Sequence, residues 1–180
     1  MTDSGDTPFK VEQTSYADSG PGEETAAPKV PSIDLESMDR SLTDVIPLFS
    51  SLNREEFTEV VDRLVHLQYP PGYRIVKEGD TGDSVYLISQ GTVQVVTKIG
   101  KREVTLSELR DNDFFGEVAF LTGRPRTASV VTKTDTEILE LRGEDLRSIV
   151  QKYPGIRGVL EQFYKKRIRD TLSKVKQPGT

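Results

Sequence analysis

Residues 114–130 read FFGEVAFLTGRPRTASV, a mostly apolar segment that nevertheless holds a carboxylate at Glu117 and a guanidinium at Arg126. These two groups are too far apart along the chain to be neighbours on one helical face. We expect residues 116–123, GEVAFLTG, to form a short helix between two strands, with Arg126 beyond its end. The two charges therefore need separate explanations.

The start of the expected short helix suits an anion. Its first-turn amides lack intrahelical partners, and Gly116 lets the backbone approach a ligand closely. The partial positive charge of a helix start favours phosphate, to which Arg126 can add paired, charge-assisted hydrogen bonds. Glu117 cannot sensibly face that anion, but a carboxylate accepts well from hydroxyl groups such as those of a ribose. The segment therefore predicts the two polar ends of one ligand, a sugar and a phosphate.

Short strands with regular turn signals surround this segment. Between residues 68 and 141 the sequence shows period-two alternation, interrupted by turn signals such as EGDTGD, SQG, KIGKR and RDND. The expected strands lie in PPGYRIV, SVYLIS, TVQVV, EVTLSEL, TASVVT and EILEL. Many short strands with such punctuation predict a small antiparallel barrel or jelly roll.

Helices are expected on both sides of the roll. SLTDVIPLF predicts a short helix that ends near Pro47, and NREEFTEVVDRLV predicts another, with a capping box between Asn53 and Glu56. After the roll, GEDLRSIVQKY predicts a helix broken by Pro154, and GIRGVLEQFYKKRIRDTLSKV predicts a longer one. The expected apolar stripe of that last helix is Ile156, Val159, Leu160, Phe163 and Ile168.

The predicted fold class is therefore α+β: an antiparallel β-roll, or jelly roll, flanked by N-terminal helices and two C-terminal helices, with a short phosphate-binding helix inserted in the roll. Residues 37–176 are expected to form one domain, with the roll at about 68–142 and the C-terminal helices at about 143–175. Residues 1–36 are rich in Ser, Thr, Gly, Pro and acid, which predicts a disordered acidic tail. That tail is either solubilising or a docking or modification segment.

The composition narrows the function classes. The 180 residues are 34% hydrophobic, enough for one core, and the net charge of −5 does not suggest a nucleic-acid partner. No stretch approaches the roughly 18 apolar residues of a membrane span. The chain has no cysteine and one histidine, His66, which predicts no metal site and fits a cytoplasmic location. The basic run YKKRIRDTLSKVK is interpreted as a solvated outer face of the last helix.

The segment FGEVAFLTGRPRTASV closely resembles the phosphate-binding cassette of cyclic nucleotide-binding domains, the family of the catabolite activator and of protein kinase A regulatory subunits. The family pattern is Phe-Gly-Glu, an Ala-hydrophobic pair, and then Pro-Arg-small-Ala before a strand. Upstream, PGYRIVKEGDTGDSVYLISQGTVQVV matches the family's glycine and strand pattern. The matching positions are Gly72, Ile75, Gly79, Gly82, Tyr86, Ile88 and Gly91. The resemblance covers about residues 41–172.

The resemblance also implies roles for individual residues. Glu117 would accept from the ribose 2′-hydroxyl, and Arg126 would pair with an exocyclic oxygen of the cyclic phosphate. The remaining residues of the implied ligand site, several of them through backbone amides, are Phe115, Gly116, Val118, Ala119, Thr127 and Ala128. The C-terminal helix would form a lid over the base, and its candidate capping residues are Phe163, Tyr164 and, ranked behind them, Leu160.

The function implied by the resemblance is a regulatory module without catalysis, which needs no cofactor and transmits ligand binding through its C-terminal helices to an unknown protein effector. Cyclic AMP is the expected ligand, and cyclic GMP remains open because Thr127 suits either base. No nucleic-acid or membrane partner is expected, and a homodimer through the last helix is left open. The alternatives are a scaffold with a vestigial pocket, or a regulatory fragment of a larger kinase, channel or transcription factor.

Overall fold

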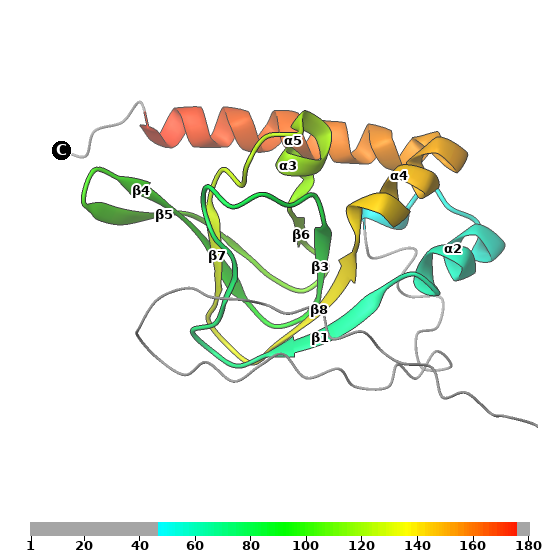
Figure 1. Cartoon of the computed structure of the whole chain (residues 1–180), viewed down its shortest axis with the longest axis horizontal. Coiled ribbons are helices and arrows are strands. Elements are labelled where there is room, and N and C mark those ends of the chain that lie inside the picture. Colours follow the sequence, from blue (N-terminus) through cyan, green and yellow to red (C-terminus); the bar gives the residue numbers. More distant parts are fainter. Residues whose placement is uncertain (1–46, 176–180) are drawn as a thin grey trace, which may run out of the picture.

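The structure is a computed structural model that describes residues 47–175. Two four-stranded antiparallel sheets form a roll, and helices cover one end of it (Figure 1). The predicted tail, residues 1–36, and most of the first expected helix lie outside the described residues. None of the described helices is both long and apolar enough to cross a membrane. The predicted fold class is confirmed.

Eight strands make up the two sheets. They are β1 (Val65–Tyr69), β2 (Arg74–Val76), β3 (Val85–Gln90), β4 (Val93–Ile99), β5 (Arg102–Leu109), β6 (Phe114–Phe115), β7 (Ser129–Thr132) and β8 (Thr136–Leu141). One sheet has the order β1-β8-β3-β6 and the other has the order β2-β7-β4-β5. Between β6 and β7 lies α3 (Glu117–Thr122), the short helix that the sequence predicts inside the roll.

Two of these strands were not predicted. β1 falls where the sequence predicts the end of a helix and its continuation, but α2 (Arg54–Val61) stops earlier and the chain then pairs with β8. That pairing runs from Val65 opposite Glu140 to Tyr69 opposite Thr136. The strand β1 therefore depends on residues of β8 that are distant in the sequence. β6 is only two residues long, too short to show an alternating pattern.

The N-terminal part of the described chain packs against the roll through a shared hydrophobic cluster. Pro47, the first described residue, lies in the short 3₁₀-helix η1 (Pro47–Phe49), and the rest of the helix predicted to end near it lies outside the described residues. At the start of α2, Asn53 Oδ1 accepts from the Glu56 amide at 3.0 Å, and Glu56 Oε2 accepts from the Asn53 amide at 2.8 Å. The predicted capping box is confirmed, and it satisfies two amides that the helix itself cannot.

The C-terminal helices are α4 (Gly143–Lys152) and α5 (Pro154–Val175), with the predicted break before Pro154. Helix α5 runs along the whole top of the molecule (Figure 1). Ile156 and Leu160 are fully buried, while Val159 and Phe163 pack at the edge of the core. Ile168 lies outside the packed core, since its side chain is 39% exposed, and it lines a pocket instead. Beyond Phe163 the helix leaves the packed core and passes over a pocket.

The core has two parts, and neighbouring aromatic residues of β6 belong to different ones. Phe114 packs into the helix-covered cluster with Leu87 and Leu160, whereas Phe115 packs into the cluster inside the roll with Ile88. Successive side chains of a strand point to opposite faces, so this split is the expected consequence of pairing β6 with β3. The backbone that enters α3 is therefore held from both sides.

A polar contact fastens α2 to the junction between α4 and α5. Glu59 Oε2 accepts from Lys152 Nζ at 2.5 Å and from the Tyr153 hydroxyl at 2.7 Å. The hydrogen bond from Lys152 is the main reason that the pKa of Glu59 lies below its ordinary value of 4.5, and the bond from Tyr153 adds to it. The folded state therefore prefers the ionised carboxylate.

This preference predicts a pH dependence. A depressed carboxyl pKa stabilises the fold above the unfolded-state value of about 4.5 and loses that contribution as the pH falls through the folded-state value. We expect Glu59→Gln to lower the melting temperature at pH 7 by a few degrees and to melt closer to the native protein below pH 4. Melting curves of both proteins between pH 7 and pH 3 measure the difference. A difference that stays constant with pH would contradict the assignment.

Candidate ligand-binding site

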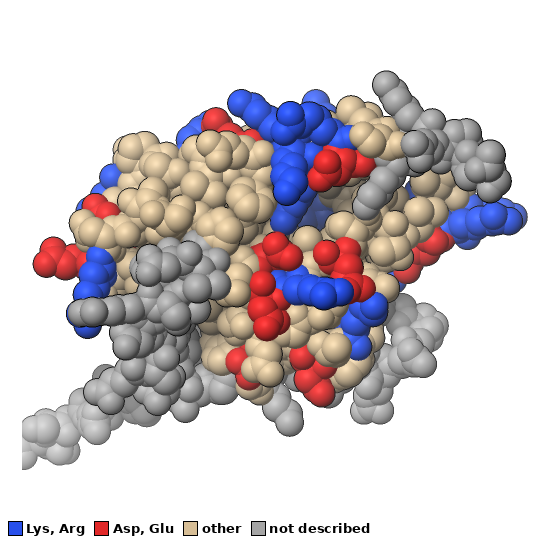
Figure 2. Space-filling model, turned by 180° about the vertical axis from the view of Figure 1, so that it is seen from behind, with Lys and Arg blue, Asp and Glu red and all other residues tan. Residues whose placement is uncertain are grey.

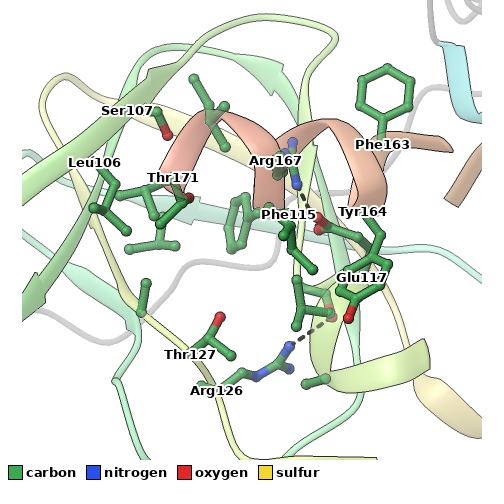
Figure 3. Close-up of a pocket in the computed structure, with 18 of the residues that line it drawn as sticks. Leu106, Ser107, Phe115, Glu117, Arg126, Thr127, Phe163, Tyr164, Arg167 and Thr171 are labelled. Atoms are coloured by element: carbon green, nitrogen blue, oxygen red, sulfur yellow. Dashed lines mark hydrogen bonds and ion pairs between the residues drawn. The ribbon is translucent and has the colours of Figure 1, made fainter. Parts of the chain in front are cut away.

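A pocket of about 630 Å³ lies between the roll and the second half of α5. The start of α3 and the segment before β7 form its floor, β4 and β5 form one wall, and α5 forms the roof (Figure 3). Predominantly apolar walls with a few polar groups are typical of small-molecule sites. Two of those polar groups, Glu117 and Arg126, are almost fully buried.

Arg126 is held in place by the backbone of two other segments. Its guanidinium donates to the carbonyl oxygen of Gly116 at 3.2 Å and to that of Ser84 at 3.0 Å. It also lies against the ring of Tyr86, 5.6 Å from the centroid. Only 7% of the residue is exposed. Arg126 therefore lies in the floor of the pocket and pairs with no carboxylate among the described residues. Its positive charge is available to an anion.

Gly116 is required where it stands. Its φ of 96° lies in the left-handed region, and an added Cβ would lie 2.5 Å from the Ser84 carbonyl oxygen and 2.9 Å from Arg126 Nη1. Any side chain here would displace the guanidinium. The glycine thus serves the position of Arg126 as well as the turn into α3.

Glu117 follows as the first residue of α3 and is 1% exposed. Its Oε2 atom accepts from Arg167 Nη1 at 2.6 Å. Its Oε1 atom is buried and, among the described residues, is the one buried side-chain nitrogen or oxygen without a hydrogen-bond partner. Buried polar atoms are nearly always paired, and an unpaired one costs about 1–3 kcal/mol. This oxygen therefore marks a place where a donor is missing.

Arg167 ties the roof to the floor and was not predicted. Besides its bond to Glu117, it donates to the Phe114 carbonyl oxygen and lies over the rings of Phe114 and Phe163, at 5.2 and 5.9 Å. The sequence interpretation assigned it to a solvated basic face. The available signal was its spacing, because Arg167 follows Leu160 and Phe163 at helical intervals on the inner side of α5.

The structure brings together ten of the predicted site residues on the pocket wall. They are Phe115, Gly116, Glu117, Val118, Ala119, Arg126, Thr127, Ala128, Phe163 and Tyr164. The third lid candidate, Leu160, does not line the pocket, because it is fully buried in the helix-covered core. Phe163 is partly engaged by Phe114, with ring centroids 4.7 Å apart, whereas Tyr164 extends from α5 toward Glu117 and α3 (Figure 3).

Several further lining residues were missed by the sequence interpretation. Leu106 and Ser107 of β5 face Thr171 of α5 across the end of the pocket away from Tyr164 (Figure 3). Their hydroxyl and apolar groups suit a flat heterocycle, which needs both apolar contact and edge hydrogen bonds. Within residues 47–173, no group of three or more histidine, cysteine, aspartate or glutamate side chains is arranged to hold a metal ion.

Comparisons with known proteins agree with this geometry. Residues 66–153 match the family model described as the cyclic nucleotide-binding domain. The chain is 35% identical over 113 residues to the cAMP-dependent protein kinase regulatory subunit of Aspergillus fumigatus, covering 63% of this chain and 27% of that protein. It is 34% identical over 125 residues to the cyclic AMP receptor protein of Thermus thermophilus, covering 69% of this chain and 58% of that protein.

Among solved structures, the catabolite activator protein of Thermus thermophilus is similar, with a TM-score of 0.65 and 32% sequence identity. The match covers 72% of this chain and 62% of that one. The chain thus spans about a quarter of the fungal subunit and somewhat over half of the bacterial receptor. The buried Glu117 and Arg126 both lie within the matched residues. Residues 66–153 of the chain therefore belong to the family of cyclic nucleotide-binding domains.

Proposed function

We propose that the chain is a regulatory sensor that binds a 3′,5′-cyclic nucleotide, cyclic AMP in preference to cyclic GMP, and has no catalysis of its own. The observation that carries this proposal is the unpaired, buried Oε1 atom of Glu117, which shares one pocket with the buried guanidinium of Arg126. A ligand with a hydroxyl donor at one end and a phosphate at the other satisfies both groups. A ribose 3′,5′-cyclic phosphate is such a ligand.

In this proposal the ribose 2′-hydroxyl donates to Glu117 Oε1, and Arg126 binds an exocyclic phosphate oxygen. The amides of Gly116, Val118 and Ala119, together with that of Thr127 or Ala128, complete the phosphate contacts. The base extends toward Ser107 and Thr171, and Tyr164 or Phe163 covers it from α5. The volume of about 630 Å³ is sufficient for a nucleotide.

The preference for cyclic AMP is supported by the relatives, whose names include cAMP in the fungal kinase subunit and in the bacterial receptor. Thr127 lines the pocket and its side chain is exposed, so it is able to bond to either purine. Cyclic GMP therefore remains a weaker expected ligand. The unknown effector protein and the cytoplasmic location expected from the sequence stay predictions.

In this proposal, ligand binding is transmitted to α5 through the two oxygens of the Glu117 carboxylate. Arg167 of the roof occupies Oε2, and the proposed ligand hydroxyl occupies Oε1. Ligand binding and the closed position of α5 then support each other, because each lowers the cost of burying the same charge. A ligand that binds the closed arrangement better shifts the population of α5 toward it.

Thermal unfolding with cyclic AMP, cyclic GMP and linear AMP tests this function. At a hundred times its dissociation constant a ligand stabilises the fold by ~2.7 kcal/mol, which corresponds to a rise of roughly 5–10 °C. We expect the full rise with cyclic AMP, a rise at higher concentrations with cyclic GMP, and none with linear AMP. No shift with either cyclic nucleotide at millimolar concentration would overturn the proposal.

One observation favours a second candidate, a scaffold that closes without ligand. The pair between Arg167 and Glu117 already holds α5 on the roll, so helix docking does not itself require a nucleotide. Such a scaffold would show no thermal shift with any nucleotide while retaining its fold. In that case the chain would be part of a larger kinase, channel or transcription factor. Thermal unfolding with the same nucleotides separates this scaffold from a cyclic nucleotide sensor.

A further inference from the structure

The second half of α5 carries a mixed basic and apolar surface of exposed side chains, two of which, Ile168 and Leu172, also line the rim of the pocket. Its residues, which we name the outer face of α5, are Lys165, Ile168, Arg169 and Leu172. Their spacing of three and four residues places them on one side of the helix. Ile168 is 39% exposed and Leu172 is 54% exposed. Figure 2 shows lysine and arginine gathered along the upper edge of the molecule, where α5 runs.

The cations of this face are not neutralised within the described part of the chain. Two other arginines of α5 have acidic partners, since Arg157 pairs with Glu161 at 2.9 Å and Arg167 pairs with Glu117 at 2.6 Å. Among the described residues, Lys165 and Arg169 pair with no carboxylate. The outer face therefore combines uncompensated positive charge with two exposed aliphatic side chains, a combination that suits an acidic and apolar partner.

The chain itself contains such a partner. Residues 33–39 read IDLESMD, in which three acids, Asp34, Glu36 and Asp39, alternate with apolar side chains. We propose that residues 33–39 dock on the outer face of α5 within the same chain. The docking goes beyond nucleotide binding and does not depend on it.

The start of the described chain makes this docking reachable. An added Cβ on Gly155, in the first turn of α5, would lie 2.7 Å from Ser51 Oγ, so the segment after η1 is beside that turn. At 1.5 Å per residue the helix rises about 15 Å from Gly155 to Lys165 and about 26 Å to Leu172. The eight residues between positions 39 and 47 span at most about 26–29 Å. The acids of residues 33–39 can therefore cover the outer face.

Tethering favours this occupant over a separate molecule. A short connection gives residues 33–39 an effective concentration on the order of millimolar at the outer face, whereas a second copy or another acidic protein must compete from dilute solution. Each exposed ion pair is weak, so the docking is expected to be salt-sensitive.

Zero-length carbodiimide cross-linking of the full chain tests the docking, because the reagent joins a carboxylate to an amine only when they are in contact. After peptide mapping at low salt we expect links from Asp34, Glu36 or Asp39 to Lys165 or its neighbour Lys166. Lys101, which is also exposed, at the turn between β4 and β5, should form none. The links should decline in 0.5 M NaCl, where the screening length is about 4 Å.

Two triple variants provide the matched comparison. The measured quantity is the total yield of links from any carboxylate of residues 1–40 to Lys165 and Lys166. The change D34N/E36Q/D39N should lower this yield roughly fivefold, whereas D3N/D6N/E12Q should leave it unchanged. Equal yields from both variants, or equal linking to Lys101, would overturn the proposal. Mixing isotopically labelled and unlabelled protein identifies links between two copies, and links of that kind alone would also overturn it.

Discussion

Replacing Arg126 with alanine is expected to weaken cyclic nucleotide binding by about a hundredfold, and by at least tenfold, while the protein stays folded. The guanidinium supplies two charge-assisted hydrogen bonds to phosphate in the proposed complex, each contributing about 1.5–3 kcal/mol, and 1.4 kcal/mol is a factor of ten. The carbonyl oxygens of Gly116 and Ser84 lose their donor but become accessible to water from the pocket. Isothermal titration calorimetry measures the affinity, and circular dichroism checks the fold.

Two further variants show whether charge or geometry is responsible. Arg126→Lys keeps the positive charge but not the planar fork, so an intermediate loss is expected. Arg124→Ala removes an exposed arginine at the edge of the same pocket and should change the affinity by less than about threefold. Equal losses for Arg124→Ala and Arg126→Ala would show general electrostatic attraction and contradict the specific role of Arg126.

Replacing Glu117 with glutamine is expected to weaken ribonucleotide binding by about tenfold and to affect the 2′-deoxy analogue by less than about threefold. The change keeps the shape of the side chain but removes the charge that accepts from the ribose hydroxyl at Oε1. The analogue has no such hydroxyl, so it loses little. Calorimetric titrations of both proteins with both ligands give the coupling between the carboxylate and the hydroxyl.

The variant Glu117→Gln also weakens the contact with α5, and a control separates this effect. Arg167→Gln removes the partner at 2.6 Å but leaves the carboxylate. It should loosen the roof and weaken the ribonucleotide and its deoxy analogue by similar factors. If Glu117→Gln also weakened both ligands equally, the carboxylate would act through the position of α5 and the sugar contact would be refuted.

Local chemistry made much of this fold predictable. The capping box at Asn53, the helix break before Pro154 and the short helix after Gly116 each follow from residues that act on their immediate neighbours. Glu117 and Arg126 could be singled out because a lone charge in an apolar segment needs a partner. These features lie within a few residues of their cause.

The features that the sequence did not predict depend on contacts between distant segments. Val65 begins a strand because β8 pairs with it, and no residue near Val65 signals that pairing. Ile168 fits an apolar stripe by spacing, but the core ends before the helix reaches it. Arg167 occurs in a basic run, and only the path of α5 over α3 shows that it contacts a buried acid. Helical spacing predicts on which side of a helix a residue lies. It does not predict how far along the helix the neighbouring segments of the fold extend.

The contact between Arg167 and Glu117 also limits how far the C-terminus of this domain can be truncated. The family match ends at residue 153, before α5 begins. A fragment trimmed to that boundary would keep Arg126 and the whole cassette, yet the interior acid Glu117 would lose Arg167, the partner of its Oε2 atom. For anyone designing a minimal biosensor from this chain, the smallest self-sufficient unit extends past Arg167, well beyond the recognisable motif.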